Sequence, residues 1–236
     1  MKRKDRIIVA LDVTNIEAGR DLVAKLYPLL KVFKVGSQLF TERGGEAVSM
    51  VKRKGADCFL DLKYHDIPET VGNAAVAATK LGADMFDVHA SGGFEMMKKA
   101  VSSSCEIAEK LKLKKPIILG ITVLTSMNKQ DLAALGIERT PAEQALFLAG
   151  QAKKAGLDGV VASSEEIEII KKELGKDFLV VVPGIRPEWS QRADQKRVAT
   201  PKEAFDRGAD YIVIGRPITE AHDPKEAAEK IVAELE

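Results

Sequence analysis

The chain is poor in cysteine and in aromatic residues, and each shortage excludes a class of protein. Its 236 residues include two cysteines, Cys58 and Cys105, which are too few for a disulfide framework and lack metal-ligand spacing. A reducing cytoplasm is therefore the expected compartment. The single tryptophan and the 5% aromatic content argue against a stacking platform for single-stranded nucleic acid.

Long apolar runs and a strong net charge are also missing. No segment approaches the roughly 18 uninterrupted apolar residues of a membrane span, and the basic residues 1–6 precede no signal-peptide core. The formal net charge of +1 creates no global field that attracts nucleic acid. We therefore expect no membrane span and no nucleic-acid partner.

What is present is an ordinary globular composition, with 45% hydrophobic and 30% charged residues. Apolar strand-like segments alternate eight times with helix-like segments, and no linker or shift in composition marks a domain boundary. Continuous apolar strands are typical of parallel sheets covered on both faces, so we expect one α/β domain over residues 1–236, a single (β/α)8 TIM barrel. The expected strands are 6–11, 32–35, 57–62, 84–89, 116–123, 159–162, 178–182 and 211–214.

A doubly wound open sheet is the alternative α/β fold. That fold usually carries a glycine-rich phosphate turn directly after its first strand. Here the corresponding stretch reads Leu11-Asp12-Val13-Thr14-Asn15 and contains no glycine. The barrel is therefore the favoured architecture.

Proline marks three of the predicted helix starts. Thr140-Pro141, Thr200-Pro201 and Asp223-Pro224 each place a capping residue before a proline at the first helical position, with a glutamate two residues later. Thr14 with Glu17 predicts a further capping box. One continuous helix is expected over residues 39–54.

Charged side chains stand at the ends of the first three predicted strands. Asp12 follows the first strand, Lys34 lies within the second, and Asp61 and Lys63 end the third. Because side chains alternate faces along a strand, Asp61 and Lys63 share one face. An unpaired ion inside an apolar strand is costly, so we expect the four to neutralise one another at the carboxyl ends of the strands, where such barrels hold their active sites. A purely structural network at the barrel mouth is the other interpretation.

The last two strands are followed by glycine and arginine. Val182-Pro183-Gly184-Ile185-Arg186 ends the seventh strand, and Gly215-Arg216 ends the eighth. Barrels often bind phosphate here, through backbone N–H groups, a short helix N-terminus and arginine. Between them, residues 187–199 form a long polar loop that includes Gln195 and is predicted to act as a lid.

The stretch Leu60-Asp61-Leu62-Lys63-Tyr64-His65-Asp66-Ile67-Pro68 resembles the signature of the orotidine 5′-phosphate decarboxylase family. The resemblance extends along the whole chain in order. It implies catalytic roles for Lys63, Asp61, Lys34 and Asp66. The substrate-binding residues that it implies are Asp12, Lys34, Asp61, Ile67, Thr70, Thr125 of Leu124-Thr125-Ser126, Pro183, Arg186, Gln195, Gly215 and Arg216.

The short Asp-x-Lys-x-x-Asp motif also occurs in sugar-phosphate enzymes of the same superfamily, such as 3-hexulose-6-phosphate synthase and 3-keto-L-gulonate-6-phosphate decarboxylase. Those resemble magnesium enzymes and place a carboxylate at the strand-two position. Here that position is Lys34, a cation that would repel Mg²⁺, so the metal-free decarboxylase is favoured. A non-catalytic nucleotide-binding barrel is a further alternative, against which the crowded charge set argues.

The resemblance implies the decarboxylation of orotidine 5′-phosphate to uridine 5′-phosphate in pyrimidine biosynthesis, with no metal and no cofactor. Lys63 would stabilise the carbanion at C6 and then protonate it. Asp61 would lie near the substrate carboxylate, while Lys34 and Asp12 would orient Lys63 and contact the ribose. In this family Asp66 reaches the site of the other subunit, so a homodimer is implied.

Overall fold

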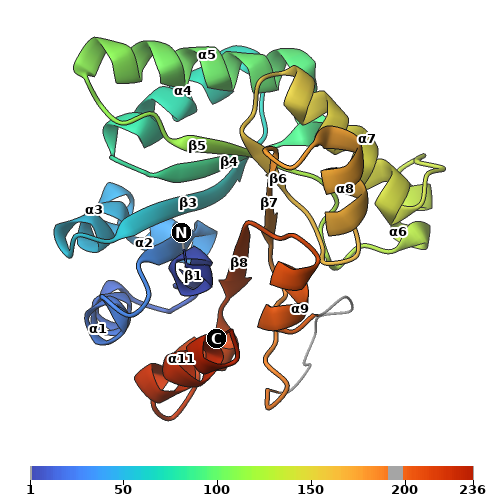
Figure 1. Cartoon of the computed structure of the whole chain (residues 1–236). Helices are drawn as coiled ribbons and strands as arrows, with labels where there is room; N and C mark the ends of the chain where they lie inside the picture. Colours follow the sequence, from blue (N-terminus) through green and yellow to red (C-terminus); the bar gives the residue numbers. More distant parts are fainter. Residues whose placement is uncertain (1, 191–198, 236) are drawn as a thin grey trace.

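The computed structural model describes residues 2–190 and 199–235. Eight parallel strands pair in sequence order and close on themselves, which confirms the predicted (β/α)8 barrel (Figure 1). The strands are β1 Ile7–Ala10, β2 Val32–Gly36, β3 Asp57–Tyr64, β4 Met85–His89, β5 Ile117–Ile121, β6 Gly159–Val161, β7 Leu179–Val182 and β8 Tyr211–Ile214.

Helices surround the strands on the outside of the barrel (Figure 1). The single helix predicted over residues 39–54 is wrong: Gly44, with φ 55°, separates two shorter helices. The helical segments are η1 Arg3–Arg6, α1 Ile16–Leu26, α2 Ser37–Arg43, α3 Gly45–Arg53, α4 Pro68–Lys80, η2 Ala90–Gly92, α5 Phe94–Leu111, α6 Lys129–Ala134, α7 Pro141–Lys154, α8 Ile167–Leu174, α9 Pro201–Asp206, α10 Arg216–Thr219 and α11 Pro224–Ala233.

The capping residues confirm the proline-marked starts and correct one prediction. Thr140 and Thr200 form complete capping boxes at the starts of α7 and α9, and Asp223 accepts two backbone N–H groups at the start of α11. Thr14 was predicted to cap α1, but Asn15 does so by accepting a 2.9 Å hydrogen bond from the N–H of Ala18. The asparagine side chain is as good a cap as threonine and lies one residue closer to the helix.

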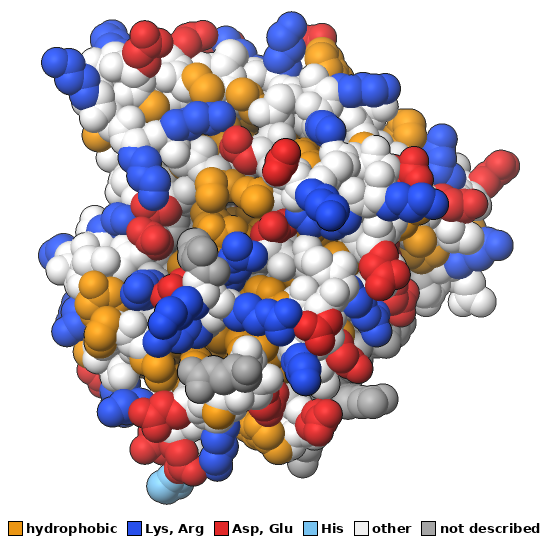
Figure 2. All heavy atoms as spheres, in the orientation of Figure 1, with side chains coloured by type: hydrophobic (Ala, Val, Ile, Leu, Met, Phe, Trp, Pro, Cys, Tyr) orange, Lys and Arg blue, Asp and Glu red, His pale blue; other side chains and the backbone are white. Residues whose placement is uncertain are grey.

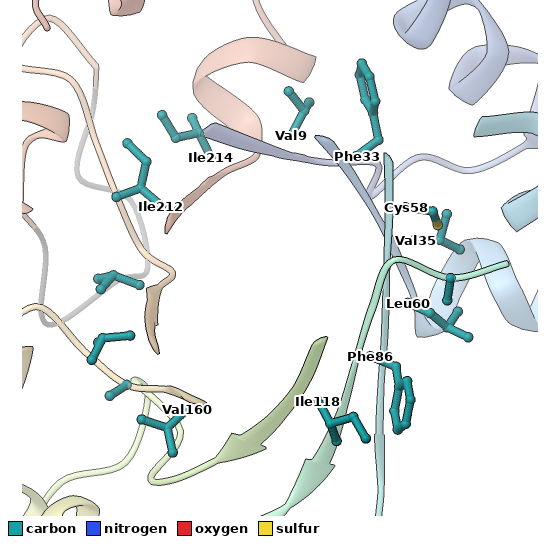
Figure 3. Packing of buried hydrophobic residues seen from close by; sticks show 14 of the residues in the cluster. Val9, Phe33, Val35, Cys58, Leu60, Phe86, Ile118, Val160, Ile212 and Ile214 are labelled. Carbon is teal, nitrogen blue, oxygen red and sulfur yellow. The ribbon is translucent and has the colours of Figure 1, made fainter. Parts of the chain in front are cut away.

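The buried core has two layers, one on each side of the strand ring. Outward-facing side chains of neighbouring strands, such as Phe33, Leu60 and Phe86, lie between the barrel and its helices (Figure 3). The smaller inner layer fills the barrel with Ile8, Ala10, Val32, Phe59, Met85, Leu119, Val181 and Val213. This alternation puts Lys34 and Asp61 on the inner face, because they follow Val32 and Phe59 by two residues.

Three aspartates tie the amino-terminal ends of the strands together. Asp84, Asp158 and Asp210 each end a Gly-x-Asp triplet directly before β4, β6 or β8, and the triplet glycines have positive φ. Each aspartate side chain accepts a backbone N–H of the preceding strand, from Cys58 at 2.9 Å, Ile118 at 2.8 Å and Val180 at 2.7 Å. The Gly-x-Asp triplet is too short to appear as an internal sequence repeat. Its hydrogen bonds nevertheless join neighbouring strands at the end of the barrel opposite the charges.

The outer surface carries charges of both signs, interspersed over the face shown in Figure 2. This mixture agrees with the formal net charge of +1. Within residues 2–190 and 199–235, no helix is long and apolar enough to cross a membrane.

Candidate active site

The four charges predicted to converge lie in one alternating chain at the carboxyl ends of β1 to β3. Lys34 Nζ lies 3.2 Å from Oδ1 of Asp12 and 3.0 Å from Oδ2 of Asp61. The other oxygen of Asp61, Oδ1, contacts Nζ of Lys63. The order Asp12, Lys34, Asp61, Lys63 therefore alternates in sign, and Asp61 bridges the two ammonium groups.

Burial and charge together set the protonation of this network. Burial alone lowers the pKa of Lys34, but the carboxylates of Asp61 and Asp12 outweigh it and hold that pKa above its usual value. Burial raises the pKa of Asp61, but the charges of Lys34 and Lys63 and a hydrogen bond with Asp87 bring it well below the usual range. Lys34 and Asp61 are therefore both charged at neutral pH.

The backbone at Lys63 departs from a regular strand. Its φ of 52° is left-handed, which is unfavourable for a residue with a Cβ, and the pairing of β3 with β4 shifts register between Leu60 and Tyr64. The predicted shared face of Asp61 and Lys63 is thus reached through a bulge and not through simple alternation. Strain of this kind is typical of functional sites, where surrounding contacts hold it in place.

Asp87 is a site residue that the sequence reasoning missed. It lies on β4, is fully buried, and its Oδ1 accepts a 2.7 Å hydrogen bond from the backbone N–H of Lys63, which holds the left-handed residue. Burial and the negative charge of Asp61 raise the pKa of Asp87 well above the usual range. A signal was present: Asp87 follows Met85 by two residues in an apolar strand, as Lys34 follows Val32.

Two connected chambers open over this network and share Lys34, Asp61, Pro183 and Val213. The first has a volume of about 260 Å³, and Lys63 and Asp87 border it together with the largely apolar set Phe59, Ile121, Val123, Leu124, Thr125, Ser126, Val161 and Ala162. Apolar walls with a few placed charges are typical of small-molecule sites. The structure thus brings the predicted Thr125 and Pro183 to the same cavity as the charges, and Ser126 borders it as well.

The second chamber, of about 200 Å³, is basic. Asp12, Gly184, Arg186, Gly215 and Arg216 border it, together with the shared residues. Gly215 precedes the short helix α10, and the N-terminus of a helix is a favourable place for an anion. The predicted phosphate residues Arg186, Gly215 and Arg216 are therefore adjacent to the charge network.

Not every predicted residue borders these chambers. Asp66, Ile67 and Thr70 lie on the turn after β3 and the start of α4, and all three are exposed, Ile67 at 66%. Asp66 Oδ1 accepts a 2.6 Å hydrogen bond from the backbone N–H of Ile67. Gln195 and most of the predicted lid lie outside the described residues.

The donor set does not suit a divalent cation. Within the described part of the chain, no group of three or more His, Cys, Asp or Glu residues is arranged to hold a metal ion. Asp12 and Asp61 flank one position that a cation could occupy, and the ammonium of Lys34 lies there. A Cβ on Gly36 would lie 3.1 Å from that ammonium, so glycine leaves room for it.

Comparison with known proteins gives consistent matches along the chain. The model of the orotidine 5′-phosphate decarboxylase / HUMPS family matches residues 5–231. The orotidine 5′-phosphate decarboxylases of Moorella thermoacetica and Pseudoalteromonas translucida are 51% and 49% identical, covering 100% and 94% of this chain and 94% of each relative. The crystal structure of orotidine 5′-phosphate decarboxylase from Lactobacillus acidophilus has a TM-score of 0.86 at 39% identity, covering 98% of this chain and 99% of that one.

Proposed function

Because the chain belongs to the orotidine 5′-phosphate decarboxylase / HUMPS family, we propose that it is a carboxy-lyase of pyrimidine biosynthesis that converts orotidine 5′-phosphate to uridine 5′-phosphate and CO₂. One observation carries this choice within the family. The ammonium of Lys34 lies between Asp12 and Asp61, over an apolar chamber that is joined to an arginine-lined one. The first chamber suits a pyrimidine and the second a phosphate.

Lys63 supplies the chemistry at C6. The bond between C6 and the carboxylate breaks, CO₂ leaves, and the electron pair stays on C6. The positive charge of the Lys63 ammonium stabilises that carbanion, and Nζ then donates the proton that completes uridine 5′-phosphate. Contact with Asp61 holds the ammonium at the chamber wall before the substrate arrives.

The position and charge of Lys63 are maintained by the other members of the network, Asp61, Lys34 and Asp12. We assign Asp61 to the side of the departing carboxylate, where its negative charge disfavours the bound carboxylate more than the carbanion. Lys34 compensates that charge and borders both chambers, while Asp12 borders the second, and we assign the two residues to the ribose. Because the network is preformed, little reorganisation is needed when charge develops at C6.

The non-reacting parts of the nucleotide are held at the two ends of the cavity. Thr125 and Pro183 border the pyrimidine end, and Arg186, Gly215 and Arg216 border the phosphate end. Arg216 can hold phosphate as a bidentate fork. We assign Gln195 to the same phosphate, as the resemblance implies. Binding energy from the phosphate can be used to assemble the site around the reacting carbon.

Magnesium chemistry on a sugar phosphate is the competing activity within the family. A cation at the site of the Lys34 ammonium would have to displace that charge and would be repelled by it. We therefore propose a reaction that requires no metal and no cofactor. The decisive assay adds orotidine 5′-phosphate to EDTA-treated protein and measures uridine 5′-phosphate. Unchanged substrate, with activity on a sugar phosphate after Mg²⁺ is restored, would reverse the assignment.

Lys63→Ala is the matching test of the catalytic residue. The variant should lose turnover while its circular dichroism spectrum shows that it stays folded, because the Lys63 side chain is 36% exposed and Asp61 keeps its pair with Lys34. Wild-type-like turnover in this variant would remove Lys63 from the mechanism.

We also propose that the protein is a homodimer, on the basis of Asp66, Ile67 and Thr70. They are exposed in one chain, and Ile67 is a large apolar side chain at 66% exposure beside the carboxylate of Asp66. We assign all three to the active site of a second copy of the chain. In this arrangement, each active site is completed by the segment after β3 of the partner subunit.

Mixing inactive chains tests the shared site. After subunit exchange, equal amounts of Lys63→Ala and Asp66→Ala chains should regain about a quarter of wild-type activity, because half of the dimers are mixed and each has one intact site. Lys63→Ala mixed with Asp61→Ala is the control and should stay inactive, because both residues belong to the same chain's site. No recovery despite confirmed exchange would count against the shared site.

The thiols support the cytoplasmic location that we propose. Cys58 and Cys105 are both free, and burial raises the pKa of the Cys58 thiol to about 12. Free thiols are typical of proteins in a reducing compartment.

A further inference from the structure

Asp87 is fully buried, borders the reaction chamber, and is absent from the mechanism above. Its Oδ1 accepts the 2.7 Å hydrogen bond from the N–H of Lys63. Its Oδ2 is also buried, and among the described residues no donor lies at hydrogen-bonding distance from it. A buried carboxylate oxygen with no donor is costly, so the protonation of this group has to be explained.

The charged and titratable groups around Asp87 come from three strands. Asp61 and Lys63 on β3 act on it directly, and the negative charge of Asp61 is repulsive. Lys34 on β2 pairs with Oδ2 of Asp61. The remaining groups are Tyr64 on β3, whose pKa burial and Asp87 raise to about 12, and His89 on β4, while β5 presents the apolar Leu119 and Ile121.

We infer that Asp87 is held as a neutral carboxylic acid, that its proton on Oδ2 is donated to Asp61, and that this proton positions the Asp61–Lys63 pair for substrate binding. A proton on Oδ2 removes both difficulties at once: it neutralises the buried group and supplies the donor for the hydrogen bond between the side chains of Asp87 and Asp61. Asp87 then supports Lys63 twice, through the backbone N–H and through Asp61.

The consequence for the reaction follows from the charge balance, and it rests on the proposed function. With Asp87 neutral, Asp12, Lys34, Asp61 and Lys63 contribute two charges of each sign. If Asp87 ionises, the chamber gains a negative charge beside the position of the substrate carboxylate. Ionisation should therefore weaken substrate binding, so that KM rises more than kcat falls and kcat/KM declines on the alkaline side.

Asp87→Asn separates this proton from other causes of alkaline inactivation. The amide has the same shape, accepts from the N–H of Lys63, donates to Asp61, and cannot ionise. Wild-type kcat/KM should fall about tenfold per pH unit above the inflection, and in Asp87→Asn this inflection should disappear. Asp87→Ala, which keeps neither bond, should lose more kcat/KM at neutral pH than Asp87→Asn. An identical alkaline inflection in wild type and Asp87→Asn would overturn the inference.

A second readout does not depend on turnover. Because the folded-state pKa of Asp87 is raised, its contribution to stability is complete below the unfolded aspartate pKa and is lost as pH rises towards the folded value. In urea unfolding across that window, the unfolding constant of wild type should rise about tenfold per pH unit relative to Asp87→Asn. A difference that does not change with pH would mean that Asp87 is ionised, whatever the enzyme activity. Absence of turnover combined with the expected stability slope would reject the proposed function alone.

Discussion

Replacing Lys34 by methionine tests which ion pair holds the charge network together. Lys34 contacts two carboxylates, but the pairs differ in burial. The side chains of Lys34 and Asp61 are 11% and 10% exposed with their charged atoms 3.0 Å apart, whereas the side chain of Asp12 is 58% exposed. An exposed pair of the second kind contributes less than about 1 kcal/mol, so the effect should come from Asp61.

The size of the stability loss in Lys34→Met depends on the contacts that Asp61 retains. Removing one member of a buried pair costs about 3–5 kcal/mol, because the other charge stays buried without compensation. In Lys34→Met, Asp61 still contacts Lys63, so we expect the free energy of unfolding to fall by the smaller amount of about 2–3 kcal/mol at neutral pH. Methionine has nearly the same length and leaves little cavity.

The sign of the pH dependence distinguishes a charge effect from a packing effect. In the wild type the pKa of Asp61 is lowered, so its contribution to stability is present above the unfolded aspartate pKa and is lost as pH falls. Without Lys34, the pKa of Asp61 should rise, and acidification should then protonate Asp61 and remove a buried charge that Lys63 alone compensates. The deficit of Lys34→Met should therefore be largest at neutral pH and shrink as the pH is lowered.

Urea unfolding followed by circular dichroism at several pH values measures this deficit. Lys230→Met is the matched control, because the pair of Lys230 with Glu226 is exposed and should contribute only about 0.3–0.5 kcal/mol. The double variant Lys34→Met/Asp61→Asn should recover part of the loss, because the buried carboxylate that had lost Lys34 is then neutral. A deficit that is independent of pH, or no larger than that of Lys230→Met, would refute the reasoning.

Three further predictions concern the phosphate site, the strand ends and a helix cap. Arg216→Ala should lower kcat/KM for orotidine 5′-phosphate by about a hundredfold or more, a loss of about 3 kcal/mol for a charge-assisted hydrogen bond, and should change little for orotidine itself; equal losses would remove Arg216 from the phosphate site. Asp210→Ala should destabilise the fold by about 1–3 kcal/mol in urea unfolding, because the N–H of Val180 loses its 2.7 Å acceptor. The exposed Asp206→Ala should cost less than about 1 kcal/mol and serves as its control. Thr140→Ala should cost about 1 kcal/mol through loss of the α7 cap, measured in the same way, and no loss would mean that the capping box contributes nothing.

The alternation of elements and the charged strand ends could be predicted because both are local properties of the chain. Apolar runs of strand length alternate eight times with helical segments, several of which begin at a capping residue, and parallel strands in that order close into a barrel. Once the barrel is recognised, Asp12, Lys34 and Asp61 have to meet at one rim, because residues at equivalent strand positions lie side by side. Gly44 shows the limit of this reasoning, because the sequence pattern does not indicate whether a glycine within a helical segment ends the helix.

The sequence by itself determined the barrel, the rim on which the site lies and the signs of its main charges, because strand period, caps and residue type are fixed residue by residue. Only the tertiary structure decided the backbone of Lys63 and the part played by Asp87. Both depend on a hydrogen bond between β3 and β4, across 24 residues of sequence. The protonation of Asp87 also depends on the tertiary structure: this carboxyl group on β4 stays neutral because it is buried and β3 places a second carboxylate beside it.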